Sequence, residues 1–314
     1  MRQNIVEYLR QCSIEKLFKT DGFANSWPVW KAEINKYAPV PTESQILALG
    51  DRLRDIFRTT SIPDRSQAGL SSGGSNWEGL VCWYLNLCSI GRRTVVIKHI
   101  KELIPEPVAD AILVNYGSFP SSTEADLIAI TFPDKQSYCI DKSLITITDV
   151  NGNQVPVKKS PRARNYNLIP VLNALVHHDF GEIEIHIIQC KTNWNDNAQI
   201  PMLWDMIYST GNVGRNIRIG NNGYVLSDAK SHSYSFVTVP TVRLSNFKTS
   251  SLSVKRVSGL TGGNYWGLES KDGVASSVKE MLNRNLRSGH NGNHLSTIRN
   301  ELNGLSTIHS YFGL

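Results

Sequence analysis

The sequence contains no apolar run approaching the ~18 residues that a membrane-spanning helix requires. Its first residues, MRQNIVEYLRQ, are polar and lack the apolar segment of a secretory signal peptide. The cysteines form no C-x-x-C pair, and their number is odd, which argues against a disulfide framework and a zinc site: Cys12, Cys82, Cys88, Cys139 and Cys190. These absences predict a soluble cytoplasmic protein with no membrane partner.

Several common enzyme motifs are also missing. The glycine-rich segments SSGGSNWEG and TGGNYWG do not continue into G-K-[ST], so no P-loop is present. The sequence has neither a G-x-S-x-G nucleophile elbow nor an H-E-x-x-H helix. His290, Asn293 and His294 stand too close together on a glycine-rich segment to supply separated metal and base positions. The chemistry therefore has to lie elsewhere.

Chain length and net charge say less about function than the missing motifs do. The chain has 314 residues, 40% of them hydrophobic, which is enough for a sizeable core, and its formal charge of +6 favours a polyanionic partner. Two basic segments and one amide-rich segment are predicted to contact DNA through Lys158, Lys159, Arg162, Arg164, Arg215, Arg218, Asn193 and Asn195. The alternative for each is an ordinary solvated surface group or, for the amides, a helix cap.

Hydrophobic periodicity predicts helices within residues 1–60, and another that starts near Trp77, capped by Ser75 or Asn76, and ends near Gly91. The pattern predicts further helices in NLIPVLNALVHH, PMLWDMIYS, VASSVKEMLNRNLR and LSTIRNELNGL. It predicts strands in TVVIKHI, ADAILVNYG, DLIAITF, SYCI, SLITITDV, EIEIHIIQCK, GYVLSD and SFVTVPTVRL, with SFPSST as a loop. The order favours an α/β core with a mixed sheet. It comprises a helical region over 1–70, a core over 71–245 and a mixed C-terminal region over 246–314.

An acid and a lysine stand at the ends of two predicted strands. Asp126 opens the apolar run DLIAI, and Gln189 and Lys191 close EIEIHIIQCK. Positions two apart share one face of a strand, so Gln189 and Lys191 point the same way. Mg²⁺ prefers hard oxygen ligands, which the Asp126 carboxylate, the Gln189 amide and the Cys190 backbone carbonyl can supply. Lys191 would orient the attacking water and offset phosphate charge. The set suits hydrolysis of a phosphodiester.

The segments TEADLI and IIQCK resemble the PD-(D/E)XK nuclease superfamily, in which one strand carries an acid and the next carries E-x-K or D-x-K. The resemblance covers about residues 75–240 and implies a restriction-endonuclease-like mixed sheet flanked by helices. It also implies a type II restriction endonuclease that cuts duplex DNA at a short specific sequence with Mg²⁺, commonly as a homodimer.

Gln189 departs from that pattern, since an acid is usual there and its loss weakens metal binding. Glu78, from the helix at Trp77, is the better candidate to restore the charge, and Glu124 is a second one. Glu182 and Glu184 face away from Gln189 on a regular strand. Three alternatives stay open: a DNA-binding protein with an inactive nuclease core, a modification-dependent or repair nuclease, and a globular enzyme unrelated to nucleic acid.

Overall fold

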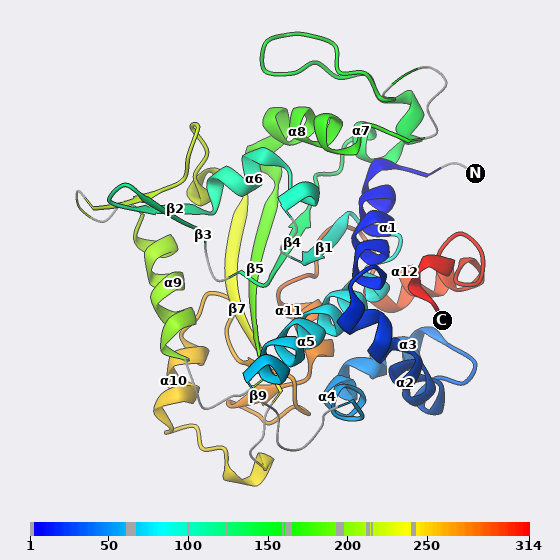
Figure 1. Ribbon diagram of the computed structural model, residues 1–314, viewed down its shortest axis with the longest axis vertical. Coiled ribbons are helices and arrows are strands. Elements are labelled where there is room, and N and C mark those ends of the chain that lie inside the picture. The colour runs from blue at the N-terminus through cyan, green and yellow to red at the C-terminus, as the bar shows by residue number, and fades with distance from the viewer. Residues whose placement is uncertain are drawn as a thin grey trace.

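The computed structural model describes residues 3–60, 67–98, 101–122, 125–158, 160, 165–192, 198–211, 214, 216–239 and 243–314. The protein is a mixed α/β structure built on a six-stranded sheet, with helices on both faces (Figure 1). In spatial order the strands of this sheet are β1 (Thr94–Lys98), β4 (Leu127–Thr131), β5 (Glu184–Lys191), β7 (Ser231–Thr238), β8 (Tyr265–Trp266) and β9 (Ala275–Ser276).

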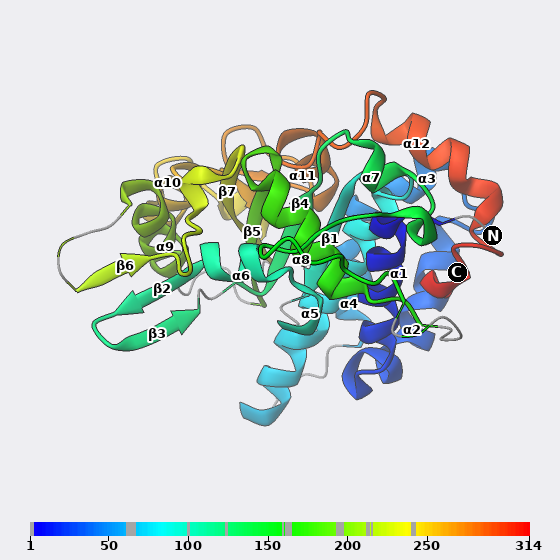
Figure 2. The same cartoon turned by 90° about the horizontal axis from the view of Figure 1, so that it is seen from above.

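The pairing of neighbouring strands changes from antiparallel to parallel at β5. The pairs β1–β4 and β4–β5 are antiparallel, whereas β5–β7, β7–β8 and β8–β9 are parallel. A parallel neighbour needs a crossover connection, which here includes α9. A second, three-stranded antiparallel sheet extends away from the body of the molecule (Figure 2) and has the order β3 (Phe119–Ser122), β2 (Leu113–Tyr116) and β6 (Ile217–Ile219).

The helices divide between the faces of the large sheet. Their bounds are α1 Ile5–Phe18, α2 Asp21–Tyr37, α3 Glu43–Ala48, α4 Leu53–Arg58, α5 Gln67–Cys88, α6 Glu106–Ala111, α7 Gln136–Cys139, α8 Leu168–Asp179, α9 Gln199–Thr210, α10 Leu252–Ser258, α11 Val278–Arg284 and α12 His294–Glu301. The face with Leu127 and Ile188 packs against α5, and the face with Ile128 and Ile187 packs against α8. Strand β5 is covered on both faces, and every residue from Glu184 to Cys190 is buried.

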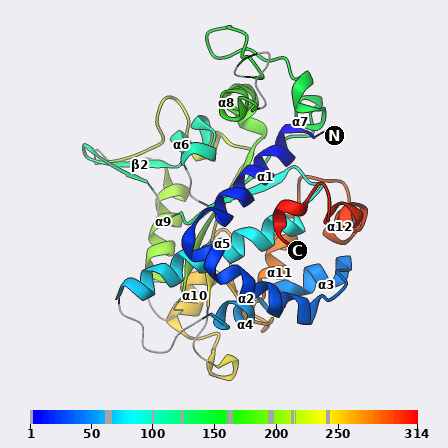
Figure 3. The ribbon, with the colours of Figure 1, turned by 45° about the vertical axis from the view of Figure 1, so that its right-hand side comes forward.

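One core draws on distant parts of the chain. Aromatic and aliphatic side chains from residues 14–57, 77–90 and 266–312 pack together with β4, β5 and β7. Figure 3 shows α1, α5 and the C-terminal segment meeting on this side of the molecule. All three predicted regions, 1–70, 71–245 and 246–314, therefore contribute to it, and two strands from beyond residue 245 extend the large sheet. The division into those regions stays a prediction.

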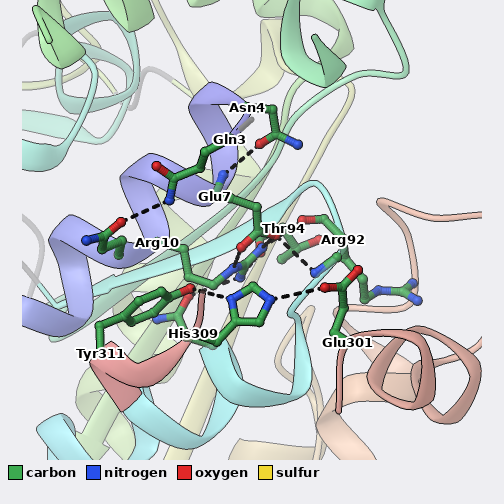
Figure 4. A network of polar contacts seen from close by, with 12 residues as sticks. Gln3, Asn4, Glu7, Arg10, Arg92, Thr94, Glu301, His309 and Tyr311 are labelled. Carbon is green, nitrogen blue, oxygen red and sulfur yellow. Dashed lines mark hydrogen bonds and ion pairs between the residues drawn. The ribbon is translucent and has the colours of Figure 1, made fainter. Parts of the chain in front are cut away.

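A buried arginine attaches α1 to the sheet. The Arg10 side chain is fully buried, and its guanidinium donates to the carbonyls of Arg92 (2.7 Å) and Thr94 (2.8 Å) and to the Glu7 carboxylate (3.0 Å). Glu7 also accepts the backbone N–H of Gly91, whose φ of +73° favours glycine. Figure 4 shows this network beside the His309–Glu301 pair, which holds the C-terminal segment. The charge on Arg10 is thus satisfied inside the core.

Several predicted elements are confirmed by the structure. The helices predicted in NLIPVLNALVHH and PMLWDMIYS are α8 and α9, and those predicted near the C-terminus are α11 and α12. The strand predicted in EIEIHIIQCK is β5, that in DLIAITF is β4 and that in TVVIKHI is β1, while only the first four residues of SFVTVPTVRL lie in β7. Each of these segments has a clear periodicity of one type.

The predicted start of the helix at Trp77 is wrong. Helix α5 begins at Gln67 and runs through the segment GLSSGGSN, which was expected to be a break. Asn76 does not cap this helix, because it lies within it and donates to the Ser26 hydroxyl at 3.1 Å. Gly79 faces Phe23, so closely that a Cβ would lie 2.7 Å from its ring. The contacts of Asn76 and Gly79 with α2 therefore help to offset the low helix propensity of the glycines in α5.

Five strand or loop predictions also need correction. SYCI forms the short helix α7, SLITITDV contributes only an isolated bridge at Thr148, and GYVLSD contributes only a bridge at Tyr224. The first half of ADAILVNYG is helical and only its second half is β2, while SFPSST, expected to be a loop, contains β3. Short apolar runs fit helix and strand patterns equally well, so the elements that they pack against determine which structure they form. No helix among the described residues is long and apolar enough to cross a bilayer.

Candidate active site

The pairing of β4 with β5 places the predicted acid next to the predicted Q-x-K segment. The two strands run antiparallel with Leu127 opposite Ile188, so the register continued by one residue sets Asp126 opposite Gln189. Because β4 begins where β5 ends, the start of one strand meets the end of the other. Alternation puts Asp126 and Gln189 on the face that also carries Ile128 and Ile187. Lys191, two residues beyond Gln189, shares that face.

A hydrogen bond fixes the Asp126 carboxylate against β5. The backbone N–H of Cys190 donates to Asp126 Oδ2 over 2.6 Å. The side chain of Asp126 is half-buried. A carboxylate has several acceptor sites, and this bond occupies one of them. The Asp126 carboxylate is therefore held at the end of β5.

Gln189 and Lys191 differ in their access to solvent. The side chain of Gln189 is fully buried, and its Oε1 accepts from the hydroxyl of Tyr234 on β7 over 3.5 Å. Lys191 is the last residue of β5 and is half-buried. The amide oxygen is thus directed at least partly towards β7, and the lysine lies at the end of β5.

Glu78 approaches the same end of the sheet from the opposite face. It lies on α5, and its carboxylate is 3.3 Å from the Nζ of Lys98, the last residue of β1. Burial raises the pKa of the Cys190 thiol well above its ordinary value, and the charges of Asp126 and Glu78 raise it further. Glu78 and Asp126 therefore lie at one end of the sheet, although Lys98 already offsets part of the charge of Glu78.

Two residues of β7 adjoin the site and were not anticipated. Tyr234 contacts Gln189, and Thr238 is in register with Lys191 across the parallel β5–β7 pair. The Thr238 hydroxyl is buried and has no hydrogen-bond partner in the part of the chain that the structure describes. SFVTVP predicts a strand, but nothing in its pattern predicts that β7 pairs with β5 or in which register.

The structure describes two of the predicted DNA contacts, Lys158 and Arg218, and they lie on different segments. Lys158 lies on the segment before α8, where it forms an isolated bridge with Tyr166, and its ammonium lies over the ring of Tyr166. Arg218 is exposed on β6, opposite Asn115 of β2. The remaining predicted site residues lie outside the described residues, and so does the second candidate for the missing charge: Lys159, Arg162, Arg164, Asn193, Asn195, Arg215 and Glu124.

The donor set suits Mg²⁺ only as an open site. Within the described residues, no group of three or more His, Cys, Asp or Glu side chains is placed to hold a metal ion. An ion at this position would rest on Asp126, with Gln189 and the Cys190 carbonyl as neutral oxygens. Mg²⁺ is commonly bound by one or two carboxylates together with waters and substrate phosphates. The residues present fit such a site once a phosphate completes it.

No model of a known protein family matches this chain, and no curated protein matches its sequence.

Proposed function

We propose that this protein is a Mg²⁺-dependent endonuclease of the PD-(D/E)XK type that hydrolyses phosphodiester bonds of duplex DNA at a short specific sequence. The observation that carries the proposal is the juxtaposition of Asp126, Gln189 and Lys191 on one face, with the Cys190 N–H bonded to Asp126. The order of α5, β1, β4, β5, α9 and β7 is what a restriction-endonuclease-like core would have, and it supports the same reading.

The roles follow from the chemistry of each group. A bound Mg²⁺ would stabilise charge on the phosphate and lower the pKa of a water molecule. Asp126, held by the Cys190 N–H, would bind that ion through its carboxylate, and the neutral oxygens of Gln189 and Cys190 would add weaker support. Lys191 would hold the attacking water and a phosphate oxygen by donating hydrogen bonds. Glu78, already paired with Lys98, would contribute negative potential from across the sheet.

A second candidate is a DNA-binding protein with an inactive nuclease core. The complete burial of Gln189 and its contact with Tyr234 favour this candidate. An amide enclosed in this way has to turn or share its oxygen before it can bind a metal ion. A modification-dependent or repair nuclease on the same core would use the same three residues and differ in its substrate.

The two candidates differ in one assay. Unmodified phage and plasmid DNA are incubated with the full chain and Mg²⁺, with EDTA as the control. Discrete fragments that depend on Mg²⁺ support the site-specific nuclease, and their sequenced ends give the site. Intact DNA that is retarded in a gel supports the inactive core. Cleavage that needs methylated or damaged DNA supports the related nuclease instead. Absence of salt-dependent DNA affinity contradicts all three.

The proposal includes a homodimer, because two-fold symmetry lets one chain cut each strand of a palindrome. Sedimentation of the full chain with and without a duplex carrying the site tests this part. Cleavage of both strands by a species of one-chain mass on the DNA would contradict it.

A further inference from the structure

We propose that the β2–β3 hairpin is a DNA wedge, whose two aromatic side chains enter the minor groove of duplex DNA and open a base step beside the site of cleavage. The inference rests on the proposed function for its partner, and it concerns a part of the molecule that contributes nothing to the reacting groups. The hairpin belongs to the small sheet that extends from the body (Figures 1 and 2).

The end of the hairpin is apolar and uncovered. Tyr116 and Phe119 lie opposite one another across the turn, and their side chains are 65% and 68% exposed. Gly117 forms the turn with a φ of +59°, and a Cβ built there meets nothing within 4 Å. Two neighbouring aromatic residues at this exposure indicate a surface that another molecule covers.

The exposed rings extend a buried stripe. On β2 and β6, Val114 and Ile219 are opposite one another and pack into the core, which anchors the base of the small sheet. Tyr116 follows Val114 on the same face, two residues closer to the tip. A wedge needs such a fixed base, because the energy for opening a base step has to come from contacts already in place.

Charge favours DNA as the occupant. Residues 113–122 and 216–219 contain Arg218 and no aspartate or glutamate. Arg218 is exposed and lies opposite Asn115 on the face away from the buried stripe, where a groove wall would present phosphates. A second copy adding a strand fits less well, because the edge strand β3 carries Pro120, and proline is typical of edges that do not accept a further strand.

The hairpin is close enough to the candidate active site. Phe119 begins β3, which ends at Ser122, and Asp126 is only four residues further along the chain. Seven residues of fully extended chain span at most about 25 Å, so the tip lies within about seven base pairs of the acid. A wedge at that distance would bend the DNA within the same bound site rather than at a remote one.

The experiment compares Tyr116→Ser/Phe119→Ser with Leu144→Ser/Val150→Ser, whose side chains are 66% and 64% exposed on another segment. Affinity for a duplex is measured by anisotropy in Ca²⁺, at several salt concentrations, with 2-aminopurine placed along the duplex to report unstacking. The tip variant should bind at least roughly tenfold more weakly and lose the 2-aminopurine signal, with an unchanged salt slope, since base–aromatic contacts are lost. Arg218→Ala should instead reduce that slope by about one.

If the tip variant binds DNA within twofold of the parent chain, the inference is overturned. It is also overturned if the tip variant binds more weakly but the parent chain gives no 2-aminopurine signal, because no base step is then opened. A tip variant that changes the sedimentation of the DNA-free chain, with DNA affinity intact, assigns the tip to a second copy and also overturns it. A chain that binds and unstacks DNA without cutting supports the wedge and contradicts the nuclease. A chain that cuts DNA but whose tip variant binds and unstacks DNA like the parent chain supports the nuclease and contradicts the wedge.

Discussion

The backbone N–H of Cys190 donates to the carboxylate of Asp126 across the junction of β4 and β5. This single bond joins two segments that are 64 residues apart in the sequence. It also fixes which way the acid faces relative to Gln189 and Lys191. A site made of strand ends needs such a contact, because side chains at the end of a strand have fewer neighbours to position them.

Asp126→Asn should abolish cleavage while leaving the fold intact. The amide oxygen can still accept the Cys190 N–H, but the charge that would hold the metal ion is gone, so the rate should fall at least roughly a hundredfold. Asp126→Ala additionally leaves that N–H unpaired and should lower the free energy of unfolding by about 1–3 kcal/mol. Rates come from plasmid nicking and stability from urea denaturation. Near-normal cutting by Asp126→Asn, or by Lys191→Ala, would contradict the assignment.

Gln189→Glu should make stability depend on divalent metal. Gln189 is fully buried beside Tyr234, so a carboxylate there bears a desolvation cost when no cation is present. The variant should melt below the parent chain in EDTA and gain more from added Mg²⁺ than the parent does. Melting curves with and without Mg²⁺ measure both effects. Equal gains for the two chains would exclude this position as a metal ligand.

Thr238→Val should not destabilise the protein. The Thr238 hydroxyl is buried without a partner among the described residues, so its removal should leave the free energy of unfolding unchanged or raise it by up to about 1 kcal/mol. Thr131→Val is the matched control, because the Thr131 hydroxyl is hydrogen-bonded to that of Thr94 over 2.8 Å. The free energy of unfolding of this control should fall by about 1 kcal/mol. Equal losses in the two variants would mean that Thr238 has a partner in the folded protein.

Stability should fall as the pH is lowered from 6.5 towards 4. Burial lowers the pKa of His186 from 6.5 to about 4, against the opposing effect of Glu184, and His232 lowers it further. In this window the unfolded chain binds a proton that the folded chain does not, so unfolding becomes easier as the pH falls. Below pH 4 this residue contributes no further loss.

The contribution of His186 should be about 3 kcal/mol over that window. Urea denaturation at intervals between pH 7 and pH 4 measures it in the parent chain and in His186→Asn, which should have a shallower dependence. The exposed His290 is the control position, and His290→Asn should retain the parent slope. A parent-like slope in the His186 variant would contradict the assignment.

Arg10→Met should be the most damaging of these substitutions. It removes the donor to the carbonyls of Arg92 and Thr94 and leaves the Glu7 carboxylate without its cation. Breaking a buried pair in this way costs about 3–5 kcal/mol. Lys36→Met, which removes an exposed partner of Glu33, should have no measurable effect. Denaturation midpoints of the two variants give the comparison, and similar values would mean that Arg10 is not an anchor.

The sequence determined the elements whose pattern has one period over enough residues. The strand Glu184–Lys191 and the helix Leu168–Asp179 follow from apolar spacing alone, because burial on a defined face selects for it. The same alternation was sufficient to place Gln189 and Lys191 on one face. Short or glycine-containing segments failed, as in the start of α5, because contacts with other elements outweigh their weak local preferences.

Only the tertiary structure decided what stands beside these residues. The register of β4 on β5 brings Asp126 to Gln189, the parallel pairing of β7 brings in Tyr234 and Thr238, and α5 carries Glu78 to the opposite face. Strand pairing depends on contacts between segments far apart in the chain, and no local pattern records them.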